Sequence, residues 1–102
     1  MTTSRQKAAG SAAEREVAAL VGGQRVGMDG GPVDVVIPGY AFIQVKALRT
    51  YPSMRALRQM LERMPTDQLR AVVIITRPGK GHTSTATITF DLDEWTAWHG
   101  EG

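Results

Sequence analysis

The chain has 102 residues, of which 42% are hydrophobic and 22% are charged. This length supports one domain with a modest core, and the composition is that of a globular protein, so two separately cored domains and general disorder are excluded. The absence of cysteine excludes disulfides, thiolate metal sites and cysteine nucleophiles. The N-terminus lacks the apolar core of a signal peptide, and the longest strongly apolar run, 71–75, is too short to span a bilayer. We therefore expect a single domain over 1–102 in a soluble, cytoplasmic protein that does not enter a membrane.

The formal charge of +2 conceals a strong segregation along the chain. Residues 1–90 hold all 12 basic residues against six acidic residues, whereas residues 91–102 hold four acidic residues and no lysine or arginine. The main body is therefore basic, with a net charge of +6. An excess of this sign favours DNA or another polyanion as a partner.

The first predicted element is an amphipathic helix over 9–21, where Ala13, Val17, Leu20 and Val21 fall on one side at 100° per residue. Two starting points are open. Ser4 is a possible cap for a long helix, and Ser11 with Glu14 forms the S-x-x-E pattern of a capping box for a shorter one.

Two or three tightly joined strands are expected next, at 24–28, 33–37 and 40–46, with glycine-rich turns between them. A second helix is predicted over 53–64, with an apolar stripe made of Met54, Leu57, Leu61 and Met64. The continuous apolar run 69–76 is typical of a central strand covered on both faces. The alternating segment 85–90 predicts a neighbouring strand with one polar face. A hairpin loop at 77–84 joins them. A last short helix, capped by Asp91 or Asp93, contains Trp95 and Trp98, which favour a packing or dimer surface over base stacking.

Polar residues of one strand pair form the candidate site. If the chain reverses around Gly39, antiparallel partners have numbers that sum to 78, which places Asp34 opposite Gln44. Lys46, two residues further along, points to the same face. Spacing alone is also compatible with a solvated sheet face.

At these residues the sequence resembles the PD-(D/E)xK nuclease superfamily, and within it the small archaeal-type Holliday junction resolvases and their phage-encoded relatives. The resemblance covers about residues 7–76. The matching positions are Lys7, Gly10, Ala13-Glu14-Arg15-Glu16-Val17, Arg25, Gly31-Pro32-Val33-Asp34-Val35-Val36 and Gln44-Val45-Lys46. It implies an α/β restriction-endonuclease-like fold, with a mixed central sheet flanked by helices, and a homodimer. The segments predicted above follow the order αβββαββα.

The resemblance also implies roles for individual residues. Glu14 corresponds to the helix glutamate of the family, Asp34 to its first metal-binding aspartate, and Gln44 and Lys46 to its (D/E)xK pair. Gln44 departs from the usual acid, although a Gln-x-Lys variant resembles one found in restriction-type relatives. Asp34, Gln44 and Glu14 are therefore the expected ligands of Mg²⁺ or Mn²⁺.

The chemistry of phosphodiester hydrolysis is consistent with these residue types. Mg²⁺ prefers oxygen ligands and retains several waters, so one or two carboxylates with an amide oxygen can hold it. A lysine beside the metal orients or deprotonates the attacking water and stabilises charge on the phosphate. On the helical wheel Glu14 lies nearer the buried edge than Glu16, which favours Glu14 as the residue that reaches the site. The competing interpretation gives Glu14 only the capping role with Ser11.

Four basic residues are candidates for contacts with DNA phosphates. Arg25 follows the first helix, Arg5 and Lys7 lie in an N-terminal arm, and Arg49 extends the basic surface. Each is also explained as an ordinary solvated side chain.

Three functions remain open from the sequence. The first is an Mg²⁺-dependent DNA endonuclease, a homodimeric Holliday junction resolvase acting on branched or four-way DNA, because a chain this short has no separate target-recognition domain and a two-fold junction matches a two-fold dimer. The second is a restriction or repair nuclease of the same fold. The third is a catalytically inactive DNA-binding or assembly accessory, with Gln44 as the lesion.

Overall fold

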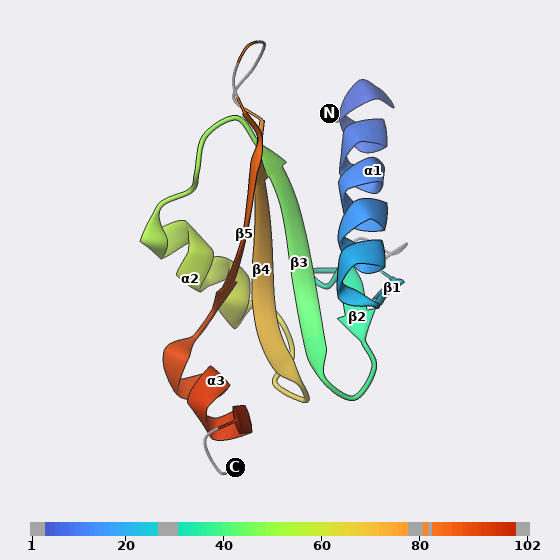
Figure 1. Cartoon of the computed structure of the whole chain (residues 1–102). Helices are drawn as coiled ribbons and strands as arrows, with labels where there is room; N and C mark the ends of the chain where they lie inside the picture. Colours follow the sequence, from blue (N-terminus) through green and yellow to red (C-terminus); the bar gives the residue numbers. More distant parts are fainter. Residues whose placement is uncertain (1–3, 27–30, 78–80, 82, 100–102) are drawn as a thin grey trace.

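The computed structural model describes residues 4–26, 31–77, 81 and 83–99, with the side chains of 4–11 left outside that description. It is an α/β structure with a mixed sheet, as the sequence predicts (Figure 1). The described elements are α1 (Ser4–Val21), β1 (Gln24–Arg25), β2 (Val35–Ile37), β3 (Ala41–Leu48), α2 (Met54–Glu62), β4 (Leu69–Thr76), β5 (Thr85–Phe90) and α3 (Leu92–His99).

The five strands follow one another across the sheet in chain order, β1-β2-β3-β4-β5. β1, β2 and β3 form antiparallel neighbours, β3 and β4 run parallel, and β5 returns antiparallel to β4. The parallel pair is joined through α2, because parallel strands need a crossover connection. The β2–β3 pairs, such as Val36 with Phe42, have the predicted offset around Gly39, whose φ of 72° makes that turn.

Residues of β3 and β4 alternate between two hydrophobic clusters, one on each face of the sheet. The cluster under α1 contains Ala13, Val17, Ala18, Val35, Ala41, Ile43, Val45, Leu69, Ala71, Val73 and Ile75. The cluster under α2 contains Leu57, Leu61, Met64, Val72 and Ile74. The two helices therefore lie on opposite faces (Figure 1), which explains why the segment 69–76 is apolar at nearly every position.

α1 follows the longer of the two predicted helices. It continues through Ser11, so the capping box of Ser11 with Glu14 is wrong, because a cap must stand at the start of a helix. After the helix Gly22 adopts a φ of 70°. A Cβ on Gly23 would lie 2.8 Å from the carbonyl oxygen of Val36, so glycine permits the close approach of this turn to β2.

α2 is shorter than predicted and begins one residue after its cap. The Ser53 side chain accepts a hydrogen bond from the Ala56 amide at 3.1 Å. Met54 was predicted in the apolar stripe, but it is 72% exposed, so that assignment is wrong. Leu57 and Leu61 hold the helix on the sheet instead.

α3 is attached to the sheet by polar contacts. Asp91, rather than Asp93, caps it, since its carboxylate accepts a hydrogen bond from the Glu94 amide at 2.9 Å. Glu94 binds both the backbone amide and the guanidinium of Arg70 on β4. The hydroxyl of Tyr40 lies 2.9 Å from Nε2 of His99. These contacts fix the last helix at one end of the sheet.

The remaining strand predictions agree with the structure to different degrees. β4 and β5 have the predicted bounds, β3 extends two residues further, and β1 and β2 are shorter. Part of the predicted strand 24–28 and of the predicted loop 77–84 lies outside the described residues. No helix within the described ranges is long and apolar enough to cross a membrane.

We expect Leu61→Ala to lower the free energy of unfolding by about 2–5 kcal/mol, because it leaves a cavity between α2 and the sheet. Leu61 is 3% exposed, whereas Leu92, a matched leucine on α3, is 75% exposed. Leu92→Ala should change the free energy by less than about 0.5 kcal/mol. Urea titration followed by circular dichroism measures both, and equal losses would contradict the assignment of the core.

Candidate active site

Asp34 occupies an irregularity in the pairing of β2 with β3. Val35 is the residue paired with Ile43, yet the Asp34 amide also donates a hydrogen bond to the Ile43 carbonyl, at 2.9 Å. Two successive residues of one strand thus face one residue of its neighbour, which is the arrangement of a β-bulge. The regular pair of Asp34 with Gln44 that the sequence predicts is therefore not formed, because the ladder ends one residue earlier.

The packing of the two flanking valines shows the same irregularity. Val35 belongs to the cluster under α1, whereas Val33 packs against the cluster under α2. In a regular strand residues 33 and 35 would share a face. Asp34 is thus an extra residue at the end of the β2–β3 ladder. Its side chain does not follow the regular alternation between the two faces of the sheet.

The carboxylate of Asp34 takes the place of a backbone acceptor beside β3. Its Oδ2 accepts a hydrogen bond from the Val45 amide at 2.8 Å. Burial raises the pKa of Asp34 above its ordinary value, and the nearby carboxylate of Glu14 raises it as well. The Val45 hydrogen bond and the charges of Lys46 and Arg25 act in the opposite direction. Two carboxylates and two cations therefore surround this point of the sheet edge.

Glu14 reaches the cluster from α1 and Arg25 from β1. Oε1 of Glu14 accepts a hydrogen bond from Nη2 of Arg25 at 3.2 Å, and both side chains are partly exposed. Glu16 turns elsewhere, since its Oε2 lies 3.3 Å from Nη2 of Arg77. Of the two helix glutamates, the structure thus places Glu14 beside Asp34.

Gln44 and Lys46 face the α2 side of the sheet. They are paired across the parallel ladder with Val72 and Ile74, which both belong to the cluster under α2. Gln44 is only 7% exposed and is the buried polar residue of the described chain. Its Oε1 has no hydrogen-bond partner among the described residues. A buried acceptor without a hydrogen-bond partner lowers the free energy of unfolding by about 1–3 kcal/mol. The presence of Gln44 on the strand beside Asp34 therefore calls for an explanation.

The predicted phosphate-binding residues are spread over several elements. Arg25 lies in the cluster, and Arg49 is exposed just after β3. Arg5 and Lys7 lie on the first turns of α1, but their side chains fall outside the described part of the chain. The structure thus brings Glu14, Arg25, Asp34 and Lys46 together and leaves Arg49 in solvent.

The described side chains contain no group of three or more histidine, cysteine, aspartate or glutamate residues that could hold a metal ion. The oxygen donors of the cluster are the carboxylates of Asp34 and Glu14, whereas the unpartnered amide oxygen of Gln44 belongs to the face of β3 that α2 covers. A hard cation such as Mg²⁺ takes donors of this kind and keeps several waters. The donor set therefore fits Mg²⁺ better than Zn²⁺, which prefers nitrogen and sulfur ligands.

The chain was compared with protein-family models, with curated proteins and with solved structures. No family model, curated protein or solved structure matches it.

We expect Gln44→Met to raise the free energy of unfolding by about 1 kcal/mol, because it removes a buried acceptor that has no partner. Gln68 provides the matched control. Its Oε1 accepts a hydrogen bond from the Gly39 amide at 2.8 Å and its Nε2 donates one to the Ile37 carbonyl. Gln68→Met should therefore destabilise the protein by about 1 kcal/mol. Thermal and urea unfolding distinguish the two variants, and destabilisation by Gln44→Met would show that the amide is satisfied.

Proposed function

We propose that this protein is an Mg²⁺-dependent DNA endonuclease with a restriction-endonuclease-like fold, and specifically a Holliday junction resolvase that hydrolyses phosphodiester bonds in branched DNA. The observation that carries the proposal is the bulge that sets the Asp34 carboxylate beside Glu14, Lys46 and Arg25. Bulges occur preferentially next to active sites, where they re-aim a side chain. The order of Glu14, Asp34, Gln44 and Lys46 along the chain is also that of the resolvases it resembles.

Asp34, Glu14 and Gln44 are the residues that would hold Mg²⁺. The raised pKa of Asp34 reflects its burial and, to a smaller extent, the neighbouring carboxylate of Glu14, and a divalent cation favours the ionised form of both groups. Gln44 contributes an oxygen that finds no partner within the described protein. When bound, the ion supplies a water of lowered pKa and neutralises charge that develops on the phosphate.

The cationic side chains of the cluster act on the substrate. Lys46, close enough to Asp34 to affect its ionisation, orients the attacking water and stabilises negative charge on the scissile phosphate. Arg25 is 39% exposed at its side chain and binds Glu14 through a single oxygen. Its guanidinium retains donors for a DNA phosphate, which is the role we propose for it.

DNA is the proposed polyanion because the body of the chain is basic. Residues 1–90 carry all 12 lysine and arginine residues, and such an excess attracts the phosphate backbone without reading sequence. A small domain that binds backbone alone discriminates DNA by shape, which favours a branched substrate and a two-fold assembly.

We expect Asp34→Asn to reduce cleavage of a four-way junction by at least about a hundredfold, because it removes a carboxylate from the proposed metal site. Asp67→Asn is the matched control, since Asp67 is exposed in the loop before β4, and it should retain wild-type cleavage. The assay compares a four-way junction with a linear duplex of the same arm sequences, in Mg²⁺ and in a chelator. Activity surviving Asp34→Asn would exclude the proposed site, and equal cutting of both substrates would exclude the resolvase.

Substitutions at two other positions separate the alternatives. Glu14→Gln should impair cleavage and Glu16→Gln should not, because only Glu14 lies at the cluster. Gln44→Glu adds the carboxylate that the family usually has and should alter the rate or the metal preference. If neither wild type nor Gln44→Glu cleaves any DNA while both bind it, the protein is the inactive accessory. Cleavage of linear duplex alone would identify a restriction or repair nuclease.

We also expect Mg²⁺ to tighten DNA binding, because it neutralises Glu14 and Asp34 in the surface that faces the phosphates. Asp34→Asn should reproduce part of that gain without metal, by about fivefold in Kd, the effect of one unit charge about 4 Å from a phosphate in water. Fluorescence anisotropy in chelator measures the Kd of wild type, Asp34→Asn and Asp67→Asn. The contrary result, no difference between Asp34→Asn and Asp67→Asn, would place the DNA elsewhere.

A further inference from the structure

α3 is held to the body of the protein largely through ion pairs between side chains. None of the residues of this helix is buried. Glu94 binds Arg70 on β4, with Oε2 at 2.9 Å from Nη2, and Asp91, which caps the helix, binds Arg58 on α2. Ion pairs near the surface stabilise little and are screened by salt. α3 therefore belongs to the part of the fold that opens most easily.

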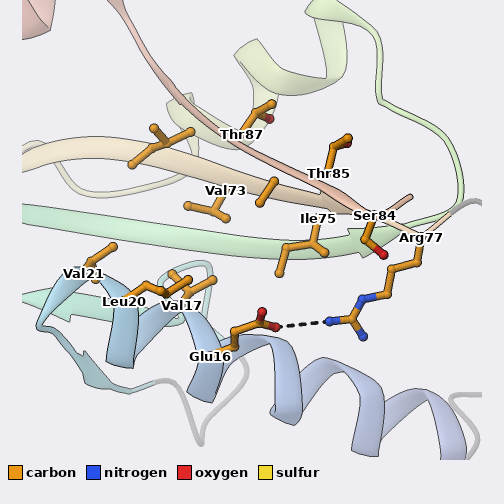
Figure 2. Close-up of a pocket in the computed structure, with 12 residues that line it drawn as sticks. Glu16, Val17, Leu20, Val21, Val73, Ile75, Arg77, Ser84, Thr85 and Thr87 are labelled. Atoms are coloured by element: carbon orange, nitrogen blue, oxygen red, sulfur yellow. Dashed lines mark hydrogen bonds and ion pairs between the residues drawn. The ribbon is translucent and has the colours of Figure 1, made fainter. Parts of the chain in front are cut away.

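The other ion pairs of the described residues involve a helix that the core holds in place. Glu14 and Glu16 on α1 bind Arg25 and Arg77, and Figure 2 shows the second of these pairs linking α1 to the residue that follows β4. α1 also packs on the sheet through buried side chains such as Val17. Loss of its ion pairs should leave α1 in place, whereas α3 has no buried residue to hold it.

The two arginines that bind α3 lie on the α2 side of the sheet. Arg70 is paired with Phe42, which packs against the cluster under α2, and its Nη1 donates a hydrogen bond to the Met64 carbonyl. Lys46 of the candidate active site faces the same side. The acidic helix thus covers basic residues on the side of the sheet that carries this lysine.

α2 itself presents a basic surface. With its C-cap it carries three arginines against one glutamate, and these arginines are Arg55, Arg58 and Arg63. Arg55 and Arg63 are exposed, and neither forms an ion pair with a described residue. Arg58 is the member of this set that an acid of the C-terminal segment neutralises.

We propose that α3 is a built-in competitor of DNA, an inference that rests on the proposed function for its choice of DNA as the polyanion. The carboxylates of Asp91 and Glu94 occupy Arg58 and Arg70, and DNA phosphates bind these arginines when α3 moves away. A guanidinium recognises carboxylate and phosphate with the same planar set of donors, so acids on a helix can take the place of phosphates. The segregation of charge agrees with this role, because residues 91–102 hold four acidic residues and no lysine or arginine.

The competition determines how tightly the protein binds DNA. Arg58 and Arg70 become available only in molecules whose α3 has been released, so the observed affinity is that of the open form reduced by the fraction of open molecules. Removing an acid that binds one of these arginines should therefore strengthen DNA binding. Removing an acid of the same helix that binds neither should have a smaller effect, limited to the general loss of negative charge.

The first experiment follows the release of α3 without DNA. The two tryptophans of the chain, Trp95 and Trp98, both lie on α3, and Trp95 packs against Phe90 with ring centroids 4.9 Å apart. In Trp98→Phe the tryptophan emission therefore reports on this contact alone. We expect the emission to shift to the red and acrylamide quenching to increase between about 0.05 M and about 1 M NaCl, because the Debye length falls to about 3 Å at the higher concentration.

Substitutions on α3 test whether the ion pairs cause this change. Glu94→Ala in the Trp98→Phe background should show the emission of the released helix already at low salt. Asp93→Ala is the matched control, because Asp93 is exposed in the same turn and forms no ion pair with the described residues; it should behave like its parent. Circular dichroism checks that each variant is folded. Emission that responds neither to salt nor to Glu94→Ala overturns the release of α3.

The second experiment measures the Kd of a labelled four-way junction by fluorescence anisotropy in a chelator, so that binding is measured without cleavage. Glu94→Ala should bind at least about fivefold more tightly than Asp93→Ala, the effect of one further unit charge about 4 Å from a phosphate in water. Both variants lose one negative charge, so general electrostatics are matched. In an Arg70→Ala background the difference between them should disappear.

Two outcomes of this experiment overturn the competition. One is equal affinity of Glu94→Ala and Asp93→Ala, and the other is the absence of DNA binding by all variants. The nuclease activity is judged separately. If the affinities follow the expected order but no DNA is cleaved in Mg²⁺, the proposed endonuclease is wrong and α3 is still a competitor of DNA.

Discussion

Eight consecutive residue pairs join β3 to β4 in parallel, and the rest of the structure depends on this pairing. Parallel strands are stable where both of their faces are buried, so a helix must cover each side. α2 is the crossover that makes the parallel pairing possible, and it covers one face, while α1 covers the other. β2, with β1 outside it, is then added beside β3, and β5 is added beside β4. One edge carries the charged cluster around Asp34, and the other carries a strand without any charge.

The sheet accepts a polar side chain inside this apolar framework at one place. Gln44 follows the same alternation as Phe42 and Leu48, which pack against the cluster under α2. A hydrophobic residue there would join that cluster without an unpartnered acceptor. Since small domains are stable by only about 5–15 kcal/mol, an unsatisfied buried amide is a substantial fraction of the total. Folding alone therefore gives no reason for an amide at this position.

The parts of this structure that depend on local pattern can be predicted from the sequence. The apolar run 69–76 gives the bounds of β4, and a turn around Gly39 gives the offset of β2 against β3. The bulge has no such signature, because Val33 and Val35 look like two residues of one face until their packing is known. Helical periodicity likewise places Met54 on the apolar side of α2. It does not show that the hydrophobic core ends before the first turn of this helix, where Met54 is exposed.

Local sequence patterns also do not predict contacts between residues that are far apart in the chain. Arg70 and Glu94, and Tyr40 and His99, are far apart in the chain, and they hold α3 through side chains that look like ordinary surface residues in the sequence. Of the candidate site, the choice of Glu14 over Glu16 followed from helical geometry, because a helix lying on a sheet presents one edge to it. The burial of Gln44 could not be predicted in this way, because it depends on the packing of α2 over the sheet.

The bulge also adds one residue to the length of chain that the sheet needs at this strand. Since Val33 and Val35 already occupy opposite faces, joining them directly would produce a regular strand with both side chains in place. Asp34 is in this sense an insertion, which the sheet accommodates by hydrogen bonds of Asp34 to Ile43 and Val45. A shortened chain that lacks this residue is therefore compatible with the same fold, and inserting one carboxylate-bearing residue into such a strand adds a charge at this point of the sheet without changing either hydrophobic cluster.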